Sequence, residues 1–460
     1  MLFVLLVFAG PVLAQPLPGA LQRALNEAGI PLADIGLVVQ DPGEARPALA
    51  VGENRVFNPA SVMKLVTTLA GLDTLGPAHT WRTGVWVDGE VQDGVLEGDL
   101  ILVGGGDPSL TLERFWLLLR EARARGLREI RGEVRIDNGL YDIAATDPGE
   151  FDNAPLKSYN AAPTALLVNY NTVALRLAPG PAGLAARLDP PALPVDNAVR
   201  IDRRAPCDGR DRIDVVREGD VLRVSGRHTE TCGERVLWLN LLCPPATVAV
   251  YFRALWRELG GAFDGAVRLG PRPDTARLWL EFDSPPLAQV VRDINKHSNN
   301  VMAKMLYLNL GLAHAGAPAT WDKADAALRA WLARRGLDIP ELALDNGSGL
   351  SRVERISAAS MARLLDWATR QPLYFEFAAS LPALGQEGTQ RRRLNGTALA
   401  GRGWLKSGTL NGVRNFAGYV LDREGRRRIV VLFVNHANAA RAAPVQEALI
   451  EWAVNGSGSP

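Results

Sequence analysis

The sequence predicts an α/β (α+β) fold, in which an antiparallel sheet flanked by helices is interrupted by β-rich inserted domains. Helical patterns gather at both ends of the chain, while residues 83–282 mostly alternate like strands with glycine turns between them. Near the C-terminus, two strand patterns joined by a turn at 422–425 indicate an antiparallel meander. The 460 residues are too many for one average domain, so two or three are expected.

Composition excludes several classes of protein. Hydrophobic residues make up 47% and charged residues 22%, which are ordinary values for a chain that buries a core. The net charge of +1 argues against a nucleic-acid partner. The five histidines occur in no metal-binding or hydrolase motif, so neither a metal nor another cofactor is expected.

The chain begins with a short apolar run that ends in Val12-Leu13-Ala14. This pattern is typical of a secretory signal peptide, expected at 1–14, and it is too short to span a bilayer. A buried N-terminal strand is the alternative interpretation. No other stretch is long and apolar enough to be a transmembrane segment, so we expect an exported protein, periplasmic or extracellular.

The three cysteines allow three pairings. The polar, glycine-bearing segment between Cys207 and Cys232 favours a disulfide between these two, in agreement with export. Cys243 follows an apolar run and is expected to be a buried free thiol. None of the cysteines has metal-ligand spacing.

The first part of the chain predicts a short helix, a strand and a longer helix. The short helix covers 20–28 and the strand covers 36–40. Asn58 suits a helix N-cap, and Pro59 suits the first helical position. Apolar residues then recur at helical spacing from 62 to 72, which gives the helix a face to bury.

The middle and last parts predict further elements from the same periodicities. Strands are expected at 83–88, 94–96, 99–103, 130–137, 168–177, 215–224, 236–242, 267–269, 277–282, 403–410, 415–421 and 428–435. Helices are expected at 112–126, 247–260, 287–295, 301–312, 324–335, 358–371 and 443–454.

Ser61 and Lys64 carry the first chemical signal. One helical turn separates them, so the hydroxyl and the amine lie side by side. A serine needs a base to become a nucleophile, and a desolvated lysine can be that base. Such pairs are also common on exposed helices. Lysine is scarce here, however, and occurs only at 64, 157, 296, 304, 323 and 406, which makes a lysine beside Ser61 more informative.

Two later motifs complete the constellation. Ser298-x-Asn300 lies in a polar junction between helices, and Lys406-Ser407-Gly408-Thr409 lies on a strand. Ser298 and Asn300 can relay the proton to the leaving amine and orient the peptide. Lys406, Ser407 and Thr409 can bind a terminal carboxylate. Gly408 lets substrate backbone lie against the strand, and the N–H groups of Ser61 and Thr409 can form an oxyanion hole. Lys406, with Lys296, would favour a neutral Lys64.

In this order, the three motifs match the set of penicillin-binding proteins and serine β-lactamases. The chain resembles the class C low-molecular-mass (type-4) penicillin-binding proteins, D-alanyl-D-alanine carboxypeptidases and endopeptidases of peptidase family S13. Further stretches carry the resemblance over nearly the whole mature chain; they lie at 102–108, 159–163, 168–169, 345–352 and 381–392. Lys406-Ser407-Gly408 departs from the commoner Lys-Thr-Gly, but it keeps the hydroxyl.

The resemblance implies a transpeptidase-like domain split by two inserted domains. The expected division is 15–80 and 282–455 for this domain, 81–104 and 165–281 for a β-rich inserted domain, and 105–164 for a second one. It also implies acyl-enzyme hydrolysis of D-Ala-D-Ala and D-Ala–diaminopimelate bonds in peptidoglycan, with β-lactams as covalent inhibitors. Arg352 and Leu410 match family positions near the diaminopimelate end, and Asp137 and Asp142 are candidates for an acidic residue there.

Two other functions use the same features. A serine β-lactamase has the same apparatus but hydrolyses its acyl-enzyme quickly, and the chain length and large insertion argue against it. A non-catalytic peptidoglycan-binding protein on this fold would not need all the reactive residues. Stem peptides of peptidoglycan are the expected partners, and a homodimer is left open.

Overall fold

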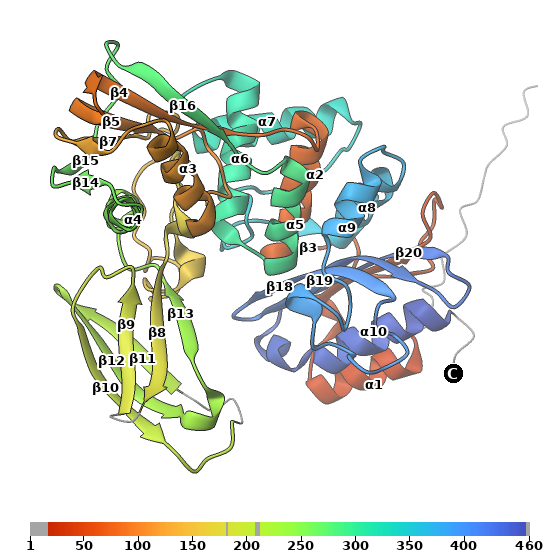
Figure 1. Ribbon diagram of the computed structural model, residues 1–460. Helices are drawn as coiled ribbons and strands as arrows, with labels where there is room; N and C mark the ends of the chain where they lie inside the picture. The colour runs from red at the N-terminus through yellow and green to blue at the C-terminus, as the bar shows by residue number, and fades with distance from the viewer. Residues whose placement is uncertain (1–16, 181–182, 208–211, 457–460) are drawn as a thin grey trace, which may run out of the picture.

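The computed structural model describes residues 17–180, 183–207 and 212–456, and the expected signal peptide at 1–14 lies outside them. The first and last parts of the chain share one five-stranded sheet in the order β18-β19-β20-β1-β2, antiparallel throughout (Figure 1). This confirms the predicted antiparallel sheet. Its strands are β1 (Ile35–Gln40), β2 (Leu49–Val51), β18 (Gly403–Leu410), β19 (Val413–Leu421) and β20 (Arg427–Val434).

Helices cover both faces of this sheet. On one face, α1 (Gly19–Ala28) and α10 (Ala443–Asn455) share an apolar core with the strands. On the other face lies a larger helical layer, packed around a second core. It contains α2 (Lys64–Leu75), α5 (Leu287–His297), α6 (Asn300–Ala315), α7 (Trp321–Arg334), α8 (Ala358–Thr369) and α9 (Tyr374–Ser380), with the short strand pair β3 (Val56–Phe57) and β17 (Ile356–Ser357) beside it.

The helix α2 lies at the centre of this layer. Its expected apolar face is buried, and so are Thr67 and Thr68 on the opposite side. The chain enters α2 through a 3-10 turn at Ala60–Met63, so Ser61 lies in this tighter turn and not in the first α-helical turn that was expected. Asn58 still stabilises the entry, because its Oδ1 accepts a hydrogen bond from the N–H of Ala60 at 2.8 Å.

Between α2 and α5 the chain builds a second region. A seven-stranded sheet holds β14-β6-β5-β4-β16 together with β7 and β15. It contains β4 (Arg82–Gln92), β5 (Val95–Val103), β6 (Glu129–Ile130), β7 (Val134–Asp137), β14 (Ala262–Phe263), β15 (Val267–Leu269) and β16 (Arg277–Asp283), with α3 (Leu112–Ala124) and α4 (Pro244–Glu258) packed on it. Both β6 and β7 pair with β5, so this sheet crosses the expected domain limit at 104.

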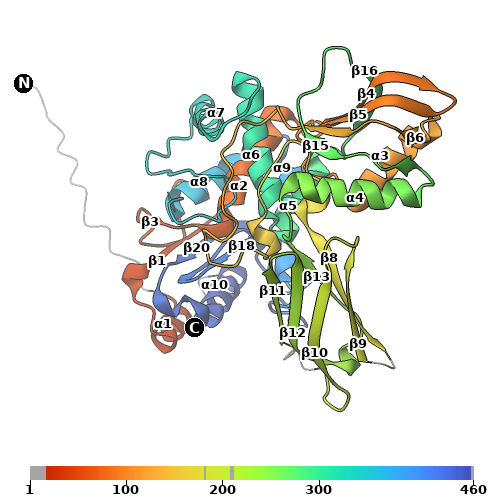
Figure 2. The same ribbon diagram turned by 90° about the vertical axis from the view of Figure 1, so that its left-hand side faces the viewer.

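Two three-stranded sheets extend from this region and lie face to face (Figures 1 and 2). One holds β13-β8-β9, with β8 (Val173–Gly180), β9 (Gly183–Asp189) and β13 (Arg235–Leu239). The other holds β10-β12-β11, with β10 (Val195–Asp202), β11 (Arg212–Glu218) and β12 (Val221–Thr229). The single strand expected at 215–224 is therefore wrong: the chain turns at Gly219, whose φ of 60° suits glycine, and forms a hairpin.

A long segment, residues 138–172, connects β7 to β8 and packs against α6 through Ala161 and Leu167. It ends in a turn at Asn169–Asn171 in which three consecutive non-glycine residues have φ of 48°, 57° and 55°. Left-handed backbone is unfavourable for such residues. The turn is held by hydrogen bonds from Asn169 Nδ2 to the Tyr251 hydroxyl at 2.7 Å and from Thr172 Oγ1 to the Asn169 carbonyl at 2.7 Å.

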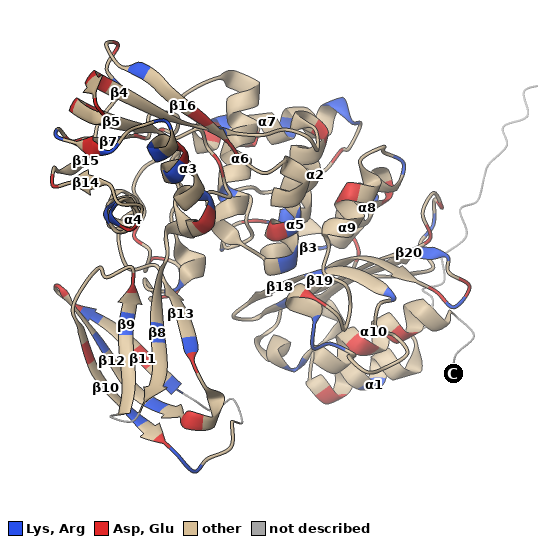
Figure 3. Cartoon of the chain, viewed as in Figure 1, with Lys and Arg blue, Asp and Glu red and all other residues tan. Residues whose placement is uncertain are grey.

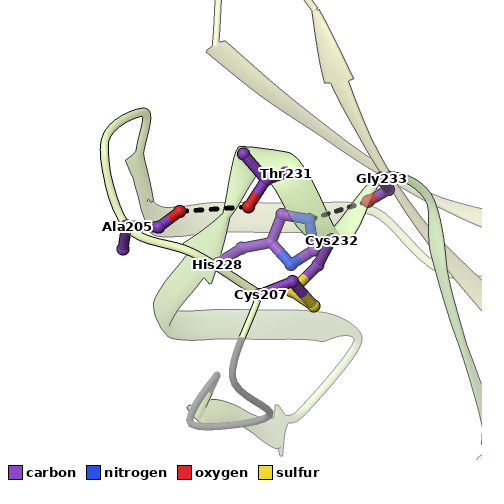
Figure 4. The surroundings of a disulfide bond; sticks show 6 residues. All are labelled: Ala205, Cys207, His228, Thr231, Cys232 and Gly233. Carbon is purple, nitrogen blue, oxygen red and sulfur yellow. Dashed lines mark hydrogen bonds between the residues drawn. A yellow bond between two sulfur atoms is a disulfide. The ribbon is translucent and has the colours of Figure 1, made fainter.

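Cys207 and Cys232 form the expected disulfide, which joins the end of β10 to the turn after β12 (Figure 4). Beside it, the Thr231 hydroxyl donates to the Ala205 carbonyl at 3.0 Å. Cys243 is a free thiol, as expected, but it is exposed and not buried. It lies at the start of α4, where the apolar run gives way to Pro244, so its side chain leaves the core.

Among the residues that the structure describes, no helix is long and apolar enough to cross a membrane.

Candidate active site

The three motifs, far apart in sequence, meet in one cluster. The turn before α2, the junction between α5 and α6, and strand β18 supply one motif each. Lys64 is at the centre and is fully buried. Its Nζ lies 3.1 Å from Ser61 Oγ and 2.6 Å from Asn300 Oδ1, and it also contacts the Ser348 carbonyl.

These three contacts fit either charge state of the amine, and the pKa of Lys64, lowered by burial, favours the neutral form. The Ser348 carbonyl can only accept a hydrogen bond, and so can Oδ1 of Asn300. A neutral Lys64 has two N–H bonds, which these two acceptors use, and one lone pair, which then points to the Ser61 hydroxyl. The lone pair is therefore available to take the proton of Ser61.

The orientation of Asn300 follows from its second contact. Its Nδ2 donates to the Tyr159 carbonyl at 3.0 Å, and a carbonyl accepts only from the amide nitrogen. Oδ1 must then face Lys64. The same hydrogen bond ties the 138–172 segment to the cluster.

The junction that carries Ser298 is conformationally strained. Ser298 has φ 57° and ψ 36°, the left-handed conformation, and it separates α5 from α6. Asn299 caps α6 by accepting from the Met302 N–H at 3.2 Å. Strain of this kind at a non-glycine residue is common in active sites. Here it directs the Ser298 hydroxyl toward β18.

Lys406 lies opposite Lys64 and is also fully buried. Its Nζ donates to Ser298 Oγ at 2.8 Å and to the Ser407 carbonyl at 3.0 Å. Burial lowers the pKa of Lys406 to about 7. The second motif thus connects with the third through a lysine, just as the first connects with the second through Lys64.

Strand β18 presents its alternate residues to the other side. The Ser407 hydroxyl hydrogen-bonds the Thr389 hydroxyl at 3.0 Å, and the Thr409 hydroxyl accepts from Arg414 at 3.0 Å. Gly408 lies against the nucleophile's turn, since a Cβ there would be 2.5 Å from the Pro59 carbonyl. Only glycine permits this approach. Leu410 is the last residue of β18.

A turn at 346–354, which includes Arg352, closes the cluster beside Lys64. A Cβ at Gly349 would be 1.9 Å from the Ala60 carbonyl, so this turn also touches the nucleophile's backbone. The turn is held by Glu354, fully buried, whose Oε1 accepts from the Gly347 N–H at 2.8 Å and from the Asn346 N–H at 3.2 Å. Burial raises the pKa of Glu354 to about 7.

Several charges act on Lys64. Burial, followed by the charge of Lys406, holds the pKa of Lys64 well below its ordinary value; Lys304 lowers it further, and Glu354 opposes the shift. The expected contribution of Lys296 is replaced by that of Lys304. Lys296 donates to the Glu387 carboxylate and to the Leu381 carbonyl at 3.3 Å.

Arg352 lies beside the 138–172 segment, with its guanidinium 4.3 Å from the centre of the Phe151 ring. Asp152 is the carboxylate at this place, and it accepts from the Tyr159 hydroxyl at 2.7 Å. Burial opposes ionisation of Asp152, but hydrogen bonds from Tyr159 and Asn160 and the charge of Arg352 leave its pKa lowered.

Neither of the two acidic residues suggested from sequence has this position. Asp137 accepts from the Gly139 and Arg272 N–H groups at 2.8 Å each, in the turn after β7. Asp142 lies near Ala319, because its backbone N–H donates a hydrogen bond to the Ala319 carbonyl. No sequence pattern distinguished Asp152, because its partners come from a loop and from a distant turn.

Metal-ligand side chains do not gather in groups of three or more anywhere in the described part of the chain. Figure 3 shows acidic and basic residues interspersed along the sheets and helices.

The cluster has the composition of a serine hydrolase in which a lysine, and not a histidine, lies beside the serine. Comparison with known proteins agrees with this class. The chain belongs to the D-Ala-D-Ala carboxypeptidase 3 (S13) family, which it matches over residues 17–455. The resemblance drawn from the motifs is thereby confirmed.

Individual relatives match most of the chain. It is 30% identical over 438 residues to a D-alanyl-D-alanine carboxypeptidase of Actinomadura, covering 90% of this chain and 80% of the relative. It is 25% identical over 393 residues to D-alanyl-D-alanine carboxypeptidase DacB of Haemophilus influenzae, covering 82% and 80%. Penicillin-binding protein 4 of H. influenzae has the same fold, with a TM-score of 0.78, 23% identity and coverage of 95% and 99%.

Proposed function

We propose that this chain is a serine D,D-peptidase that hydrolyses D-Ala-D-Ala and D-Ala–diaminopimelate bonds of peptidoglycan through an acyl-enzyme on Ser61. One observation carries the proposal: Lys64 Nζ lies between Ser61 Oγ and Asn300 Oδ1, at 3.1 and 2.6 Å, with its lone pair left for the serine proton. Membership of the S13 family and the carboxypeptidase activity in the names of the relatives support the same reaction.

In the proposed acylation, Ser61 Oγ attacks the carbonyl carbon of D-alanine while its proton moves to Lys64 Nζ. The N–H groups of Ser61 and Thr409 stabilise the oxyanion. When the tetrahedral intermediate collapses, the amide C–N bond breaks, and the leaving amine takes a proton that Ser298 delivers. Lys406 then replaces the proton of Ser298. Before deacylation, the proton that Lys64 took from Ser61 passes through solvent to Lys406, which restores the neutral amine of Lys64 and the charge of Lys406. Lys64 then takes a proton from the attacking water and passes it to Ser61 Oγ as the ester C–O bond breaks and the peptide leaves as a carboxylic acid.

Substrate binding is assigned to both ends of the cluster. A terminal carboxylate would meet the hydroxyls of half-buried Ser407 and exposed Thr409, with the charge of buried Lys406 beside them. The diaminopimelate end would meet Arg352 and Leu410, and we add Asp152, whose carboxylate can bind an ammonium group. β-Lactams would acylate Ser61, because they present the same carbonyl and carboxylate.

We further propose that the protein is exported, periplasmic or extracellular, and that its signal peptide is 1–14. The proposed peptidase domain comprises 15–80 and 282–455, with inserted domains at 81–104 and 165–281 and at 105–164. The sheet pairing between β5 and β7 means that the two inserted domains share one sheet. Measurement of the protein's mass in solution decides whether it forms a homodimer.

The test is product analysis by mass spectrometry on cross-linked and uncross-linked peptidoglycan fragments. We expect release of D-alanine from pentapeptides, cleavage of D-Ala–diaminopimelate cross-links, and neither product with Ser61→Ala. D-Alanine release that is unchanged in Ser61→Ala would contradict the proposed nucleophile. Penicillin should give a stoichiometric burst with slow release; rapid turnover would instead identify a serine β-lactamase.

A further inference from the structure

The molecule contains a large cavity next to the active site that the proposed reaction does not use. Its volume is about 1300 Å³, above the range of roughly 300 to 1,000 Å³ typical of small-molecule sites. Its lining residues come from the 138–172 segment and from the edges of the two face-to-face sheets. Such a volume suits a polymer segment better than a metabolite.

Two open strand edges line this cavity. Every residue from 213 to 217 of β11 and from 235 to 239 of β13 lines it. Successive residues of a strand point to opposite faces, so a cavity that touches all of them lies at the strand's edge. In the described residues β11 pairs only with β12, and β13 pairs with β8 and makes one bridge, to Lys157. Unpaired backbone groups of this kind can bind an extended peptide.

Side chains at the cavity favour the same occupant. Trp238 and Val216 line it and are 47% and 52% exposed, so apolar surface is available at its rim. Basic and acidic side chains also line it, namely Lys157, Arg217 and Arg235 beside Asp214, and Arg217 lies 4.0 Å from Asp220. An extended peptide, which carries both carboxylates and an amine, therefore matches this mixture better than a neutral glycan.

The cavity and the active site are joined by one stretch of backbone. Lys157 and Ser158 line it, and the carbonyl of the next residue, Tyr159, accepts from Asn300. Adjacent residues are about 3.8 Å apart, while an extended tetrapeptide spans up to about 14 Å. A peptide cross-linked to the one at Ser61 can therefore reach the cavity.

We propose that this cavity binds the second stem peptide of a cross-linked substrate, extended along the open edges of β11 and β13. The inference rests on the proposed peptidase function and deepens it. The peptide at Ser61 is cleaved, while the cavity holds the peptide attached to its leaving amine. The site would raise the enzyme's preference for cross-links over terminal D-alanine.

The test compares a glycan-free cross-linked peptide dimer with a glycan-free pentapeptide. We expect Trp238→Ala and Lys157→Gln each to raise KM for the dimer about tenfold, with kcat and all pentapeptide constants unchanged. Leu278→Ala, which removes a hydrophobic side chain of 45% exposure outside the cavity, is the matched control. Equal losses on both substrates, or no loss on the dimer, would overturn the proposal.

Direct binding separates this inference from the proposed function. Ser61→Ala cannot be acylated, and we expect it to bind the dimer about tenfold more tightly than Ser61→Ala with Trp238→Ala. This result would support the cavity as a peptide site even if the wild-type protein hydrolysed neither substrate. Binding of chitotetraose that is lost on Trp238→Ala, with dimer binding unchanged, would assign the cavity to glycan and overturn the proposal.

Discussion

Replacing Lys64 by arginine separates the charge of this residue from its role as a base. Lys64 Nζ lies 3.1 Å from Ser61 Oγ, and its other contacts leave one lone pair for the serine proton. Arginine keeps a positive charge but does not lose its proton at working pH. Lys64→Met is the companion variant, because it keeps an unbranched side chain and has neither charge nor base.

The magnitude follows from the reaction step. General-base catalysis contributes about 10²- to 10⁴-fold, or roughly 3 to 5 kcal/mol in the barrier. Both variants should therefore lower the second-order rate of penicillin acylation by at least about a hundredfold. Burial of the wild-type amine also means that its base form exists well below the pH at which an exposed lysine loses its proton.

The assay is covalent labelling with a fluorescent penicillin, followed over time in the intact protein by mass spectrometry. Thermal unfolding shows whether each variant is folded. Lys323→Arg is the matched control, since Lys323 is a surface residue whose Nζ binds the Pro318 carbonyl at 2.7 Å. General-base catalysis makes a large contribution to the rate, so its loss should be easy to detect. If folded Lys64→Arg were acylated at a rate within about fivefold of wild type, Lys64 would not be the base.

Four further predictions concern the groups of the active site. Glu354→Gln should move the acidic limb of the acylation rate to lower pH, because Glu354 raises the pKa of Lys64; a limb that moves upward would contradict this. In the wild-type protein, the pKa of Glu354 is raised from 4.5 to about 7 by folding, so the free energy of unfolding falls by about 3 kcal/mol as pH rises between these values. Glu354→Gln should remove this fall, and chemical denaturation at pH 5 and pH 8 measures it. For a substrate with a terminal carboxylate, KM should rise above pH about 7 as Lys406 loses its charge, and the same rise with a terminal amide would argue against that contact. Gly408→Val should lower kcat/KM by more than about a hundredfold, because the new Cβ would lie 2.5 Å from the Pro59 carbonyl; steady-state hydrolysis checks this, and near-normal activity would mean that β18 does not approach the nucleophile's turn.

The local chemistry was predictable from the sequence because each motif is short and periodic. Ser61 and Lys64 are three residues apart, so helical geometry alone brings them together. The antiparallel sheet was predictable too, since the last two strands are largely apolar runs joined by a tight turn. The hairpin of β11 and β12 was not predictable from the sequence. Neither strand has a strong buried face, so the sequence predicted a single strand in their place.

The supporting contacts could not be predicted, because they depend on tertiary packing. Glu354 and Asp152 act through backbone and side-chain partners that no spacing rule connects to them. The predicted burial of Cys243 was wrong for a similar reason, because the apolar run ends at the start of α4. Lys296 was expected near Lys64, but the pairing with Glu387 directs it elsewhere.

The pairing of β1 with β20 affects the order in which the protein can fold. Leu37 is paired with Leu432, so the catalytic sheet joins residues from opposite ends of the chain. The inserted region has its own core, drawn from residues 85–280, and can form during synthesis as soon as that stretch is complete. The nucleophile, by contrast, is synthesised early and waits for β18 to β20 before its site exists. We therefore expect an incomplete chain to be inert toward both peptidoglycan and penicillin, with a late, slow step in which the two ends of the chain join.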